Sequence, residues 1–147
     1  MGEILSFGSS SKFKTDLGGN MRIIIVGGIA AGMSAAAKLK RANKEAQITV
    51  YEKSRHVSFG ACGLPYFVGN FFEDSQKMIA RTVEQFNASG ITVNIEHEVL
   101  NVDTDNKCIT VKNLLTGETF TDTYDKLMIA TGASAIIPPI NNVDLKH

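Results

Sequence analysis

The 147-residue sequence has few cysteines, no excess of charge of either sign and no long apolar run. Its two cysteines lie far apart, which excludes a disulfide framework and favours a reducing, cytoplasmic setting. Lys plus Arg and Asp plus Glu both number 15, so nothing indicates nucleic acid or an anionic membrane as a partner. No apolar run reaches the roughly 18 residues of a membrane span. The run 23–31 leads into a basic helix rather than a signal-peptide cleavage site.

Length and composition predict one globular domain with a sizeable core. The first 20 residues contain four Ser and four Gly without a sustained apolar period. Residues 1–21 are therefore expected to be a mobile extension or a remnant left by cloning, with Met21 as a natural start. We expect the folded chain to begin at Arg22.

The expected folded part of the chain begins with a pattern typical of a nucleotide-binding unit. Residues 23–26 form an unbroken β-branched run, which predicts a strand buried on both faces of a parallel sheet. A glycine-rich turn at 27–32 follows, then a helix to about residue 43 and a second strand, 47–51, that ends at Glu52. This order of strand, glycine turn, helix, strand and acidic residue predicts a dinucleotide site.

The spacing within this unit supports the same interpretation, although the glycine pattern is imperfect. Glu52 lies twenty residues after Gly32, where a carboxylate can accept hydrogen bonds from the adenosine ribose, and the pyrophosphate would rest on N–H groups at the helix start. Ile29 occupies the middle glycine position, so close approach to the pyrophosphate would depend on Gly27 and Gly28. The alternative is a merely structural turn, which the strand, helix and Glu52 in register disfavour.

The first helix carries a polar stripe. Ser34, Lys38 and Arg41 fall at i, i+4 and i+7, so they share one face. Two cations and a hydroxyl could hold phosphates. From these residues alone, a solvated basic helix end that complements the macrodipole is the favoured interpretation.

The segment 58–66 contains the most informative cysteine. Cys62 follows a loop-like stretch and precedes an apolar run that could open a helix, where backbone N–H groups favour the reactive thiolate. The only other cysteine, Cys108, is too distant in sequence for a disulfide-oxidoreductase pair. A redox role for Cys62 would need an external partner: a substrate thiol, a persulfide, a peroxide or a flavin. The alternative is a small buried hydrophobe.

The remainder of the chain is predicted to consist mainly of strands and turns. A capping box at Thr82 begins a short helix that ends at Gly90. Small residues at 130–133 follow a buried-looking strand and would let a flat cofactor approach the backbone. His56 and His97 lack ligand-spaced companions, so no metal site is expected. The further predicted strands are 91–95, one starting near 98, the hairpin strands 108–115 and 119–124, and 126–130.

Four motifs in order, 27–32, 52–53, 58–66 and 130–133, resemble the FAD-dependent pyridine nucleotide–disulfide oxidoreductases. The single-cysteine branch, with coenzyme A-disulfide reductases, NADH oxidases and NADH peroxidases, is most similar. The Ser-Phe-x-x-Cys-Gly-Leu-Pro-Tyr form is closest to coenzyme A-disulfide and related persulfide reductases. The resemblance covers residues 22–147. It implies an α/β fold, a Rossmann-like FAD-binding domain with a parallel sheet plus an antiparallel hairpin or meander.

The resemblance also implies roles for individual residues. Cys62 would be catalytic, beside the isoalloxazine of FAD. Ala61 departs from the asparagine that such reductases often carry there, which puts one substrate contact in doubt. The implied FAD-binding residues are Gly27, Gly28, Ile29, Ala30, Gly32, Glu52, Lys53, Val99, Ala130, Thr131 and Gly132. The residues that match coenzyme A contacts are Ser34, Lys38, Arg41 and Ser58.

At the level of the whole protein, the resemblance implies a longer, homodimeric, cytoplasmic enzyme. Residues 22–137 would be part of its FAD-binding domain, and 138–147 would start a linker to an NAD(P)H-binding domain that this chain lacks. The expected reaction is NAD(P)H-dependent reduction of coenzyme A disulfide, or a related disulfide or persulfide. Two alternatives stay open: an NADH oxidase or peroxidase that uses a cysteine sulfenic acid, and a flavin-binding fragment without turnover of its own.

Overall fold

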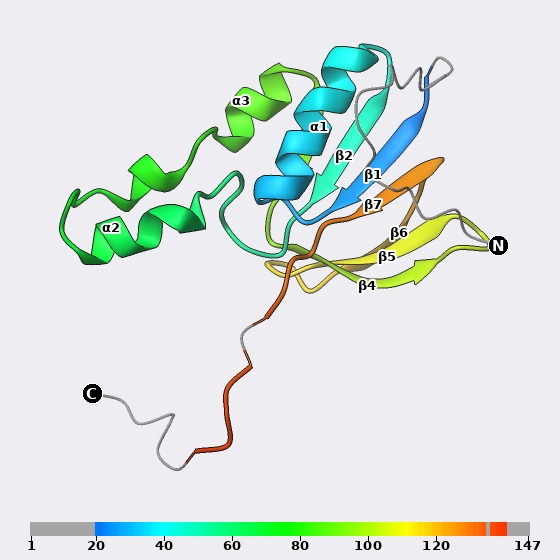
Figure 1. Ribbon diagram of the computed structural model, residues 1–147. Coiled ribbons are helices and arrows are strands. Elements are labelled where there is room, and N and C mark those ends of the chain that lie inside the picture. The colour runs from blue at the N-terminus through cyan, green and yellow to red at the C-terminus, as the bar shows by residue number, and fades with distance from the viewer. Residues whose placement is uncertain (1–19, 135, 141–147) are drawn as a thin grey trace, which may run out of the picture.

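The structure is a computed structural model that describes residues 20–134 and 136–140. Most of the predicted extension 1–21, and the end of the predicted linker 138–147, lie outside these residues. Figure 1 shows the arrangement of the elements. In the text, η denotes a short 3₁₀ helix. In chain order they are β1 (Arg22–Val26), α1 (Ala30–Ala42), β2 (Gln47–Tyr51), η1 (Ala61–Gly63), α2 (Leu64–Val68), η2 (Ser75–Met78), α3 (Val83–Ala88), β3 (Ile91–Asn94), β4 (His97–Asp103), β5 (Cys108–Asn113), β6 (Thr119–Thr123) and β7 (Lys126–Ile129).

A four-stranded sheet of order β3-β2-β1-β7 forms the centre, and all its pairs are parallel. The β-branched run of β1 is buried on both faces, as predicted. Ile23 and Ile25 belong to one core cluster, whereas Ile24 and Val26 belong to another. Each fully buried aliphatic side chain of this kind contributes about 1.5–3 kcal/mol of hydrophobic stabilisation.

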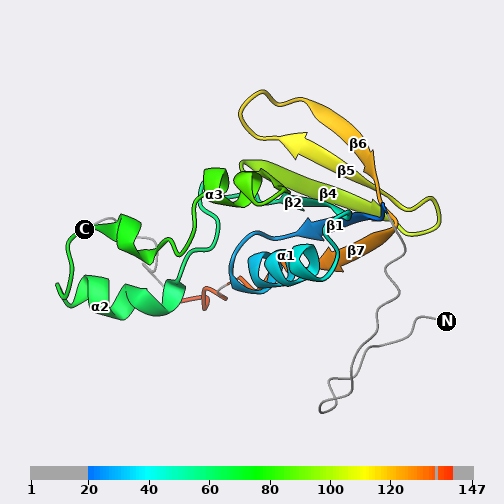
Figure 2. The same cartoon turned by 90° about the horizontal axis from the view of Figure 1, so that it is seen from above.

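The two core clusters lie on opposite faces of this sheet. α1 packs Met33 and Ala36 on one face, and α3 adds Phe86 to the same cluster. On the other face lies an antiparallel sheet of order β4-β5-β6, which contributes Ile109 and Val111 to the second cluster. Figure 2 shows the parallel sheet between α1 and this three-stranded sheet. The predicted α/β class and the antiparallel meander are therefore confirmed.

The structure corrects the expectation for residues 126–130. They were predicted to form a buried strand, but β7 is the edge of the parallel sheet. Leu127 and Met128 are half-buried against the two clusters, whereas Lys126 is exposed and Ile129 is 64% exposed. An apolar run can mark a strand without showing which strand lies at the edge.

Other local predictions are confirmed. The Thr82 hydroxyl accepts a hydrogen bond from the backbone N–H of Gln85, whose side chain accepts one from the Thr82 N–H. This capping box starts α3, and Gly90 follows its end with φ +80°.

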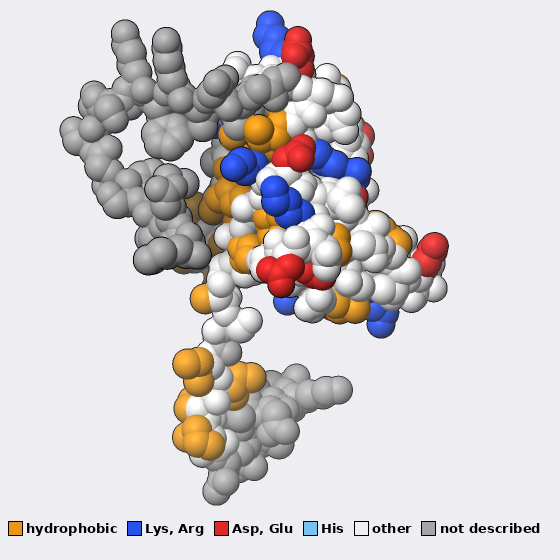
Figure 3. Space-filling model, turned by 90° about the vertical axis from the view of Figure 1, so that its right-hand side faces the viewer, with side chains coloured by type: hydrophobic (Ala, Val, Ile, Leu, Met, Phe, Trp, Pro, Cys, Tyr) orange, Lys and Arg blue, Asp and Glu red, His pale blue; other side chains and the backbone are white. Residues whose placement is uncertain are grey.

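Large apolar side chains are exposed in several places, and two segments hold the most exposed of them. One is the segment around α2, where Val68 and Phe71 are each 78% exposed. The other is the segment 136–140, with Ile136 and Ile137 exposed. Figure 3 shows apolar side chains gathered on the extension that leaves the body of the molecule at its carboxyl end. Within the described residues, no helix combines the length and apolarity needed to cross a membrane.

Candidate functional site

A pocket of about 470 Å³ opens where β1, β2 and β7 reach their carboxyl ends. Parallel sheets bind nucleotides at this edge. The predicted FAD-binding residues that line it are Gly27, Ile29, Glu52, Lys53, Val99, Ala130, Thr131 and Gly132. Residues from three of the four sequence motifs thus meet in one pocket.

Glu52 is buried at the base of this pocket and is held by backbone donors. Its Oε2 accepts a hydrogen bond of 2.6 Å from the Gly28 N–H, and its Oε1 accepts one of 2.8 Å from the Ser54 N–H. A carboxylate oxygen has two lone pairs, so each oxygen can accept one further hydrogen bond. The carboxylate is therefore fixed in direction and still able to receive two hydroxyl donors.

The glycines of the turn are required by the protein's own packing. A Cβ on Gly27, whose φ is +104°, would lie 2.3 Å from the carbonyl oxygen of Ala130. A Cβ on Gly32 would lie 1.8 Å from the carbonyl oxygen of Gly27. The turn is therefore pressed between the end of β7 and the first turn of α1. The expected approach of a pyrophosphate to Gly27 and Gly28 stays a prediction, and the packing described here concerns Gly27 and Gly32.

The start of α1 presents unused backbone donors to the same region. Ile29 occupies the N-cap position, and no side chain of the described chain caps the helix there. The predicted residues Ala30 and Gly32 lie in the first turn, where N–H groups have no intrahelical acceptor. Such a helix start favours an anion through its free N–H groups and its dipole.

Sequence reasoning missed an aromatic group beside the pocket. Tyr51 and His97 both line it, and their ring centroids are 6.2 Å apart. Phe120 lies 6.3 Å from Tyr51 and 6.2 Å from His97. His97 lies two residues before Val99, so strand alternation could have placed it on the same face of its strand, and Tyr51 immediately precedes Glu52 in the chain. The other lining residues that were not predicted are Val26, Ser54 and Glu98, whereas Ala133 belongs to the small-residue segment 130–133 that was expected to face a cofactor.

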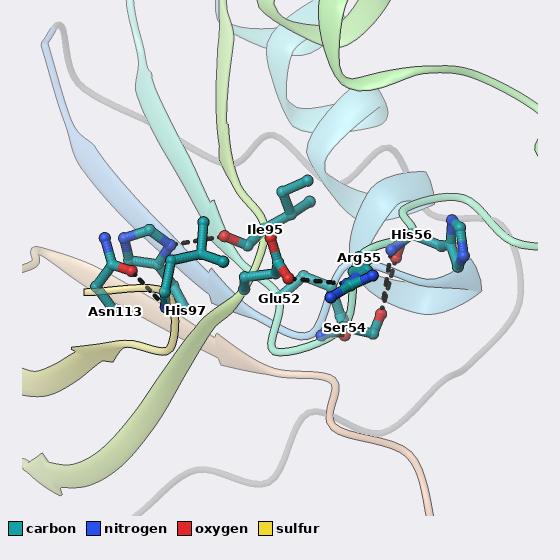
Figure 4. Close-up of polar contacts among 9 residues, drawn as sticks. Glu52, Ser54, Arg55, His56, Ile95, His97 and Asn113 are labelled. Atoms are coloured by element: carbon teal, nitrogen blue, oxygen red, sulfur yellow. Dashed lines mark hydrogen bonds and ion pairs between the residues drawn. The ribbon is translucent and has the colours of Figure 1, made fainter. Parts of the chain in front are cut away.

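His97 has a defined orientation. Its Nδ1 lies 2.7 Å from the carbonyl oxygen of Ile95, a contact drawn in Figure 4. In a neutral ring, donation from Nδ1 to a carbonyl leaves Nε2 as an acceptor. Two residues further along β4, the strand register shifts between Val99 and Asn101, which marks a bulge beside the pocket.

Cys62 lies outside this pocket. It is an exposed free thiol in η1, immediately before α2, so the predicted helix start after the cysteine is present. The loop that leads to it is tied to the glycine turn, because the Ser58 N–H donates to the Gly28 carbonyl over 2.8 Å. Cys62 and Ser58 are therefore linked to the pocket through the backbone without lining it.

The predicted phosphate-binding stripe is only partly gathered by the structure. Ser34, Lys38 and Arg41 are all exposed on α1. Of the three, Arg41 lines a second pocket of about 460 Å³, whereas Ser34 and Lys38 do not. This second pocket is bordered by Ala37, Lys40, Arg41, Lys44, Arg81, Ser89 and Ile91, so four of its residues are basic and none is acidic.

Two further properties bound the chemistry of the described residues. They contain no group of three or more His, Cys, Asp or Glu side chains that could hold a metal ion. Cys62 and Cys108 are both free thiols, and Cys108 is half-buried on β5. The thiol that is exposed to a reaction partner is therefore Cys62.

Comparison with known proteins identifies the family that has this architecture. The family model described as pyridine nucleotide-disulphide oxidoreductase matches residues 21–147. Coenzyme A disulfide reductase of Staphylococcus epidermidis is 44% identical over 115 residues, which cover 78% of this chain and 26% of the relative. NADH oxidase of Enterococcus faecalis is 38% identical over 127 residues, which cover 86% of this chain and 28% of that relative. The solved structure of reduced CoADR-RHD from Bacillus anthracis has a TM-score of 0.80 and 37% identity, covering 83% of this chain and 22% of that one.

This chain therefore spans about a quarter of the length of the curated relatives it matches, 26% and 28% for the two described. The structural similarity extends through the parallel sheet, its helices and the antiparallel sheet, which form a Rossmann-like FAD-binding fold. The family consists of oxidoreductases that use FAD and NAD(P)H. The chain belongs to the pyridine nucleotide-disulphide oxidoreductase family.

Proposed function

We propose that the full-length protein is a cytoplasmic, homodimeric FAD-dependent reductase in which Cys62 reduces coenzyme A disulfide, or a related disulfide or persulfide, with NAD(P)H. The observation that carries this proposal is the position of Gly28. Its N–H donates to Glu52 in the pocket, and its carbonyl accepts from Ser58 in the loop that leads to Cys62. The backbone of one residue thus joins the candidate ribose acceptor to the loop of the candidate nucleophile.

The residues of the pocket fit FAD. The two remaining lone pairs of the Glu52 carboxylate suit a pair of ribose hydroxyls, and the amides at the start of α1 suit a pyrophosphate. The half-buried Val99 on β4 would meet the adenine through its backbone, with the aromatic rings of Tyr51 and His97 as walls. Thr131 and Gly132 continue the pocket beyond β7. When bound, FAD would transfer an electron pair from NAD(P)H to sulfur, while the protein supplies position and electrostatics.

Cys62 would act as a nucleophile. As a thiolate it attacks one sulfur of coenzyme A disulfide, which forms a mixed disulfide on Cys62 and releases one coenzyme A thiolate. Two electrons, supplied as hydride by NAD(P)H, then cleave the mixed disulfide. This regenerates the Cys62 thiolate and releases the second coenzyme A as a thiol that carries the proton of the hydride, while the first coenzyme A thiolate takes up one proton from solution. The exposure of Cys62 is compatible with attack on a substrate of this size.

The basic border of the second pocket favours a substrate with phosphates. Arg41, Lys40, Lys44 and Arg81 surround it without a carboxylate among the lining residues. Arg81 is already oriented, because its guanidinium lies 4.3 Å from the Phe86 ring centroid and donates to the Gln85 carbonyl. Arginine in a fixed orientation is well suited to phosphate. These residues, with the neighbouring Ser34 and Lys38, are the proposed coenzyme A contacts.

A second function is an NADH oxidase or peroxidase. The 38% identity with NADH oxidase of Enterococcus faecalis favours it. In this case the Cys62 thiolate would attack a peroxide oxygen and become a sulfenic acid, while the other oxygen leaves as hydroxide. Two electrons from NAD(P)H would return the sulfenic acid to the thiolate, with release of water. The two functions share the pocket and the cysteine and differ in the oxidant.

Steady-state oxidation of NADH and NADPH by the full-length protein tests this proposal. Coenzyme A disulfide, a persulfide, hydrogen peroxide and oxygen should be compared as acceptors. We expect turnover with a disulfide or persulfide that Cys62→Ser abolishes while FAD remains bound. Cys108→Ser is the matched control and should keep its activity, because Cys108 lies on β5 away from the lined pockets. Undiminished disulfide reduction by Cys62→Ser would refute the assignment.

A further inference from the structure

We propose that Ser58 is a positioning residue whose left-handed backbone holds η1, the turn that carries Cys62, against the glycine turn 27–32, from here on called the phosphate loop. Occupancy of the nucleotide pocket and the reactivity of Cys62 are thereby coupled. The inference rests on the proposed function, in which Cys62 is the nucleophile. It concerns the backbone of Ser58 rather than its hydroxyl.

The first observation is the anchoring of Ser58 to the phosphate loop. Its N–H donates to the Gly28 carbonyl over 2.8 Å, and the Gly28 N–H donates to Glu52 over 2.6 Å. The preceding Val57 is 2% exposed and belongs to the main core cluster. A Cβ on Gly28 would lie 3.2 Å from the Val57 side chain and 2.9 Å from the Glu52 Cβ. The chain is therefore fixed in place up to the nitrogen of Ser58.

The second observation is a set of contacts on the other side of the segment. The Ser58 carbonyl accepts from the Ala80 N–H over 3.0 Å, and the Gly60 N–H donates to the Met78 carbonyl over 2.7 Å. Between them, Phe59 and Ile79 form an antiparallel bridge. Residues 58–60 are therefore held between the phosphate loop and residues 78–80.

The third observation is the turn that carries the thiol. The Gly63 N–H donates to the Gly60 carbonyl over 2.8 Å and closes η1 around Cys62. The direction of this turn depends on residues 58–60, because they connect it directly to the anchored Val57. A rotation at Ser58 would redirect Cys62 while leaving Val57 in the core.

Ser58 has a φ of +52°, in the left-handed region. L-residues other than glycine seldom adopt this region, and β-branched residues do so with the greatest strain. Such a conformation persists only where the surroundings determine it. Here two hydrogen bonds determine the conformation of Ser58: its N–H donates to the Gly28 carbonyl, and its carbonyl accepts from the Ala80 N–H. A ligand that moves Gly28 and Glu52 therefore also changes the constraint on Ser58, and binding linkage makes this effect reciprocal.

Substitutions at Ser58 separate the backbone role from a hydroxyl contact. Ser58→Thr keeps the hydroxyl but adds a β-branch that strains the left-handed backbone. Ser58→Ala and Ser58→Gly remove the hydroxyl but tolerate the conformation as well as serine or better. Asn70→Thr is the matched control, because Asn70 has a φ of +58° and lies eight residues beyond Cys62.

The experiment measures alkylation of Cys62 by N-ethylmaleimide in the full-length FAD-bound protein, followed by mass spectrometry of the Cys62 peptide. We expect Ser58→Thr to raise the rate by about fivefold or more, the low end of typical coupling, because a turn freed from its anchors opens more often. Ser58→Ala, Ser58→Gly and Asn70→Thr should stay near the wild-type rate. A larger change in Ser58→Ala than in Ser58→Thr, or no change in Ser58→Thr, would overturn the proposal.

A second measurement tests the coupling to the pocket. ADP, added to protein freed of FAD, fills the ribose and pyrophosphate positions but has no isoalloxazine that could cover Cys62. ADP should slow alkylation of Cys62 in the wild type and in Ser58→Ala, and this effect should be lost in Ser58→Thr. An equal ADP effect in all three would refute the coupling. Neither measurement depends on turnover, so failure of the proposed disulfide reduction in the Cys62→Ser assay is distinguishable from failure of this inference.

Discussion

The Tyr51 hydroxyl donates a hydrogen bond of 2.7 Å to Asp122 Oδ2 and so joins the parallel sheet to the antiparallel sheet directly behind the pocket. Asp122 is also paired with Arg22 and accepts from the Thr123 N–H over 2.8 Å. Both Tyr51 and Asp122 are buried. The three-stranded sheet supplies Val99 and His97 to the pocket, so this polar contact helps to fix the pocket's width.

Replacement of Tyr51 by Phe tests this contact through its pH dependence. Burial raises the pKa of Tyr51 well above the ordinary 10.0, and the hydrogen bond to Asp122 and its negative charge raise it further, against the opposing charge of Arg22. The stabilisation from a raised pKa is fully present below the unfolded pKa and is lost as the pH rises above it. The loss of stability above pH 10 should therefore be smaller in Tyr51→Phe, which lacks this group.

Urea unfolding of the folded protein at neutral pH and above pH 10 measures the effect. At neutral pH we expect Tyr51→Phe to lose about 1–3 kcal/mol, because Asp122 loses a charge-assisted partner. Tyr66→Phe is the control, since Tyr66 is 58% exposed and should change neither quantity. An alkaline loss in Tyr51→Phe as steep as in the wild type would contradict the interpretation.

The sequence predicted the fold well because its signals are local. The β-branched run of β1, the capping box of α3 and the turn glycines each specify an element without knowledge of its neighbours. The edge position of β7 and the Tyr51–Asp122 contact depend on how distant segments pair, 71 residues apart in the second case. The order of strand, glycine turn, helix, strand and acidic residue pointed to Glu52, because this pattern is also local. The aromatic group of Tyr51, His97 and Phe120 forms only after the two sheets pack.

Alanine substitutions at one glycine of the turn 27–32 and at one glycine between β5 and β6 should separate packing from backbone strain. Gly32→Ala would place a Cβ 1.8 Å from the Gly27 carbonyl oxygen, a backbone atom that cannot shift without moving the turn. Gly117 has a φ of +77° but nothing within 4 Å of an added Cβ. We expect Gly117→Ala to cost about 1–2 kcal/mol from strain alone and Gly32→Ala to cost more than about 4 kcal/mol. Equal costs in urea unfolding would show that the turn relaxes easily.

Glu52→Ala should weaken FAD binding by the full-length protein. The substitution removes the acceptor for two ribose hydroxyls and leaves the Gly28 and Ser54 N–H groups without their partners. Each unpaired buried group costs about 1–3 kcal/mol, so affinity should fall about tenfold or more. Isothermal titration of the apoprotein with FAD measures it, with Glu118→Ala on the exposed β5–β6 turn as the control. Unchanged affinity in Glu52→Ala would show that the carboxylate does not receive the ribose.

The double variant Lys38→Ala with Arg41→Ala tests recognition of the phosphates. If these cations hold coenzyme A, the KM for coenzyme A disulfide should rise, while a small uncharged disulfide should be reduced as before. Lys107→Ala with Lys126→Ala removes two exposed cations elsewhere and controls for the change in net charge. Exposed ion pairs contribute about 0.2–1 kcal/mol each, so a rise of about two- to thirty-fold is expected. Equal losses with both substrates would favour a solvated basic helix end.

The 147-residue chain by itself should show no NAD(P)H-dependent turnover, even with added FAD. Its phosphate loop at 27–32 is committed to the pocket of Glu52, and the described residues contain no second glycine loop of this kind for NAD(P)H. The exposed apolar side chains around α2 and at 136–140 would favour self-association of the isolated chain.

Spectrophotometric assay of the purified chain with NADH, FAD and coenzyme A disulfide measures the turnover. Retention of FAD on gel filtration separates flavin binding from turnover. Weak flavin binding without NADH oxidation is the expected result, because Glu52 and the start of α1 can hold the adenosine diphosphate half while nothing in the pocket delivers a hydride. NADH-driven reduction of disulfide or oxygen by this chain would contradict this prediction and would mean that the chain holds a site for NADH.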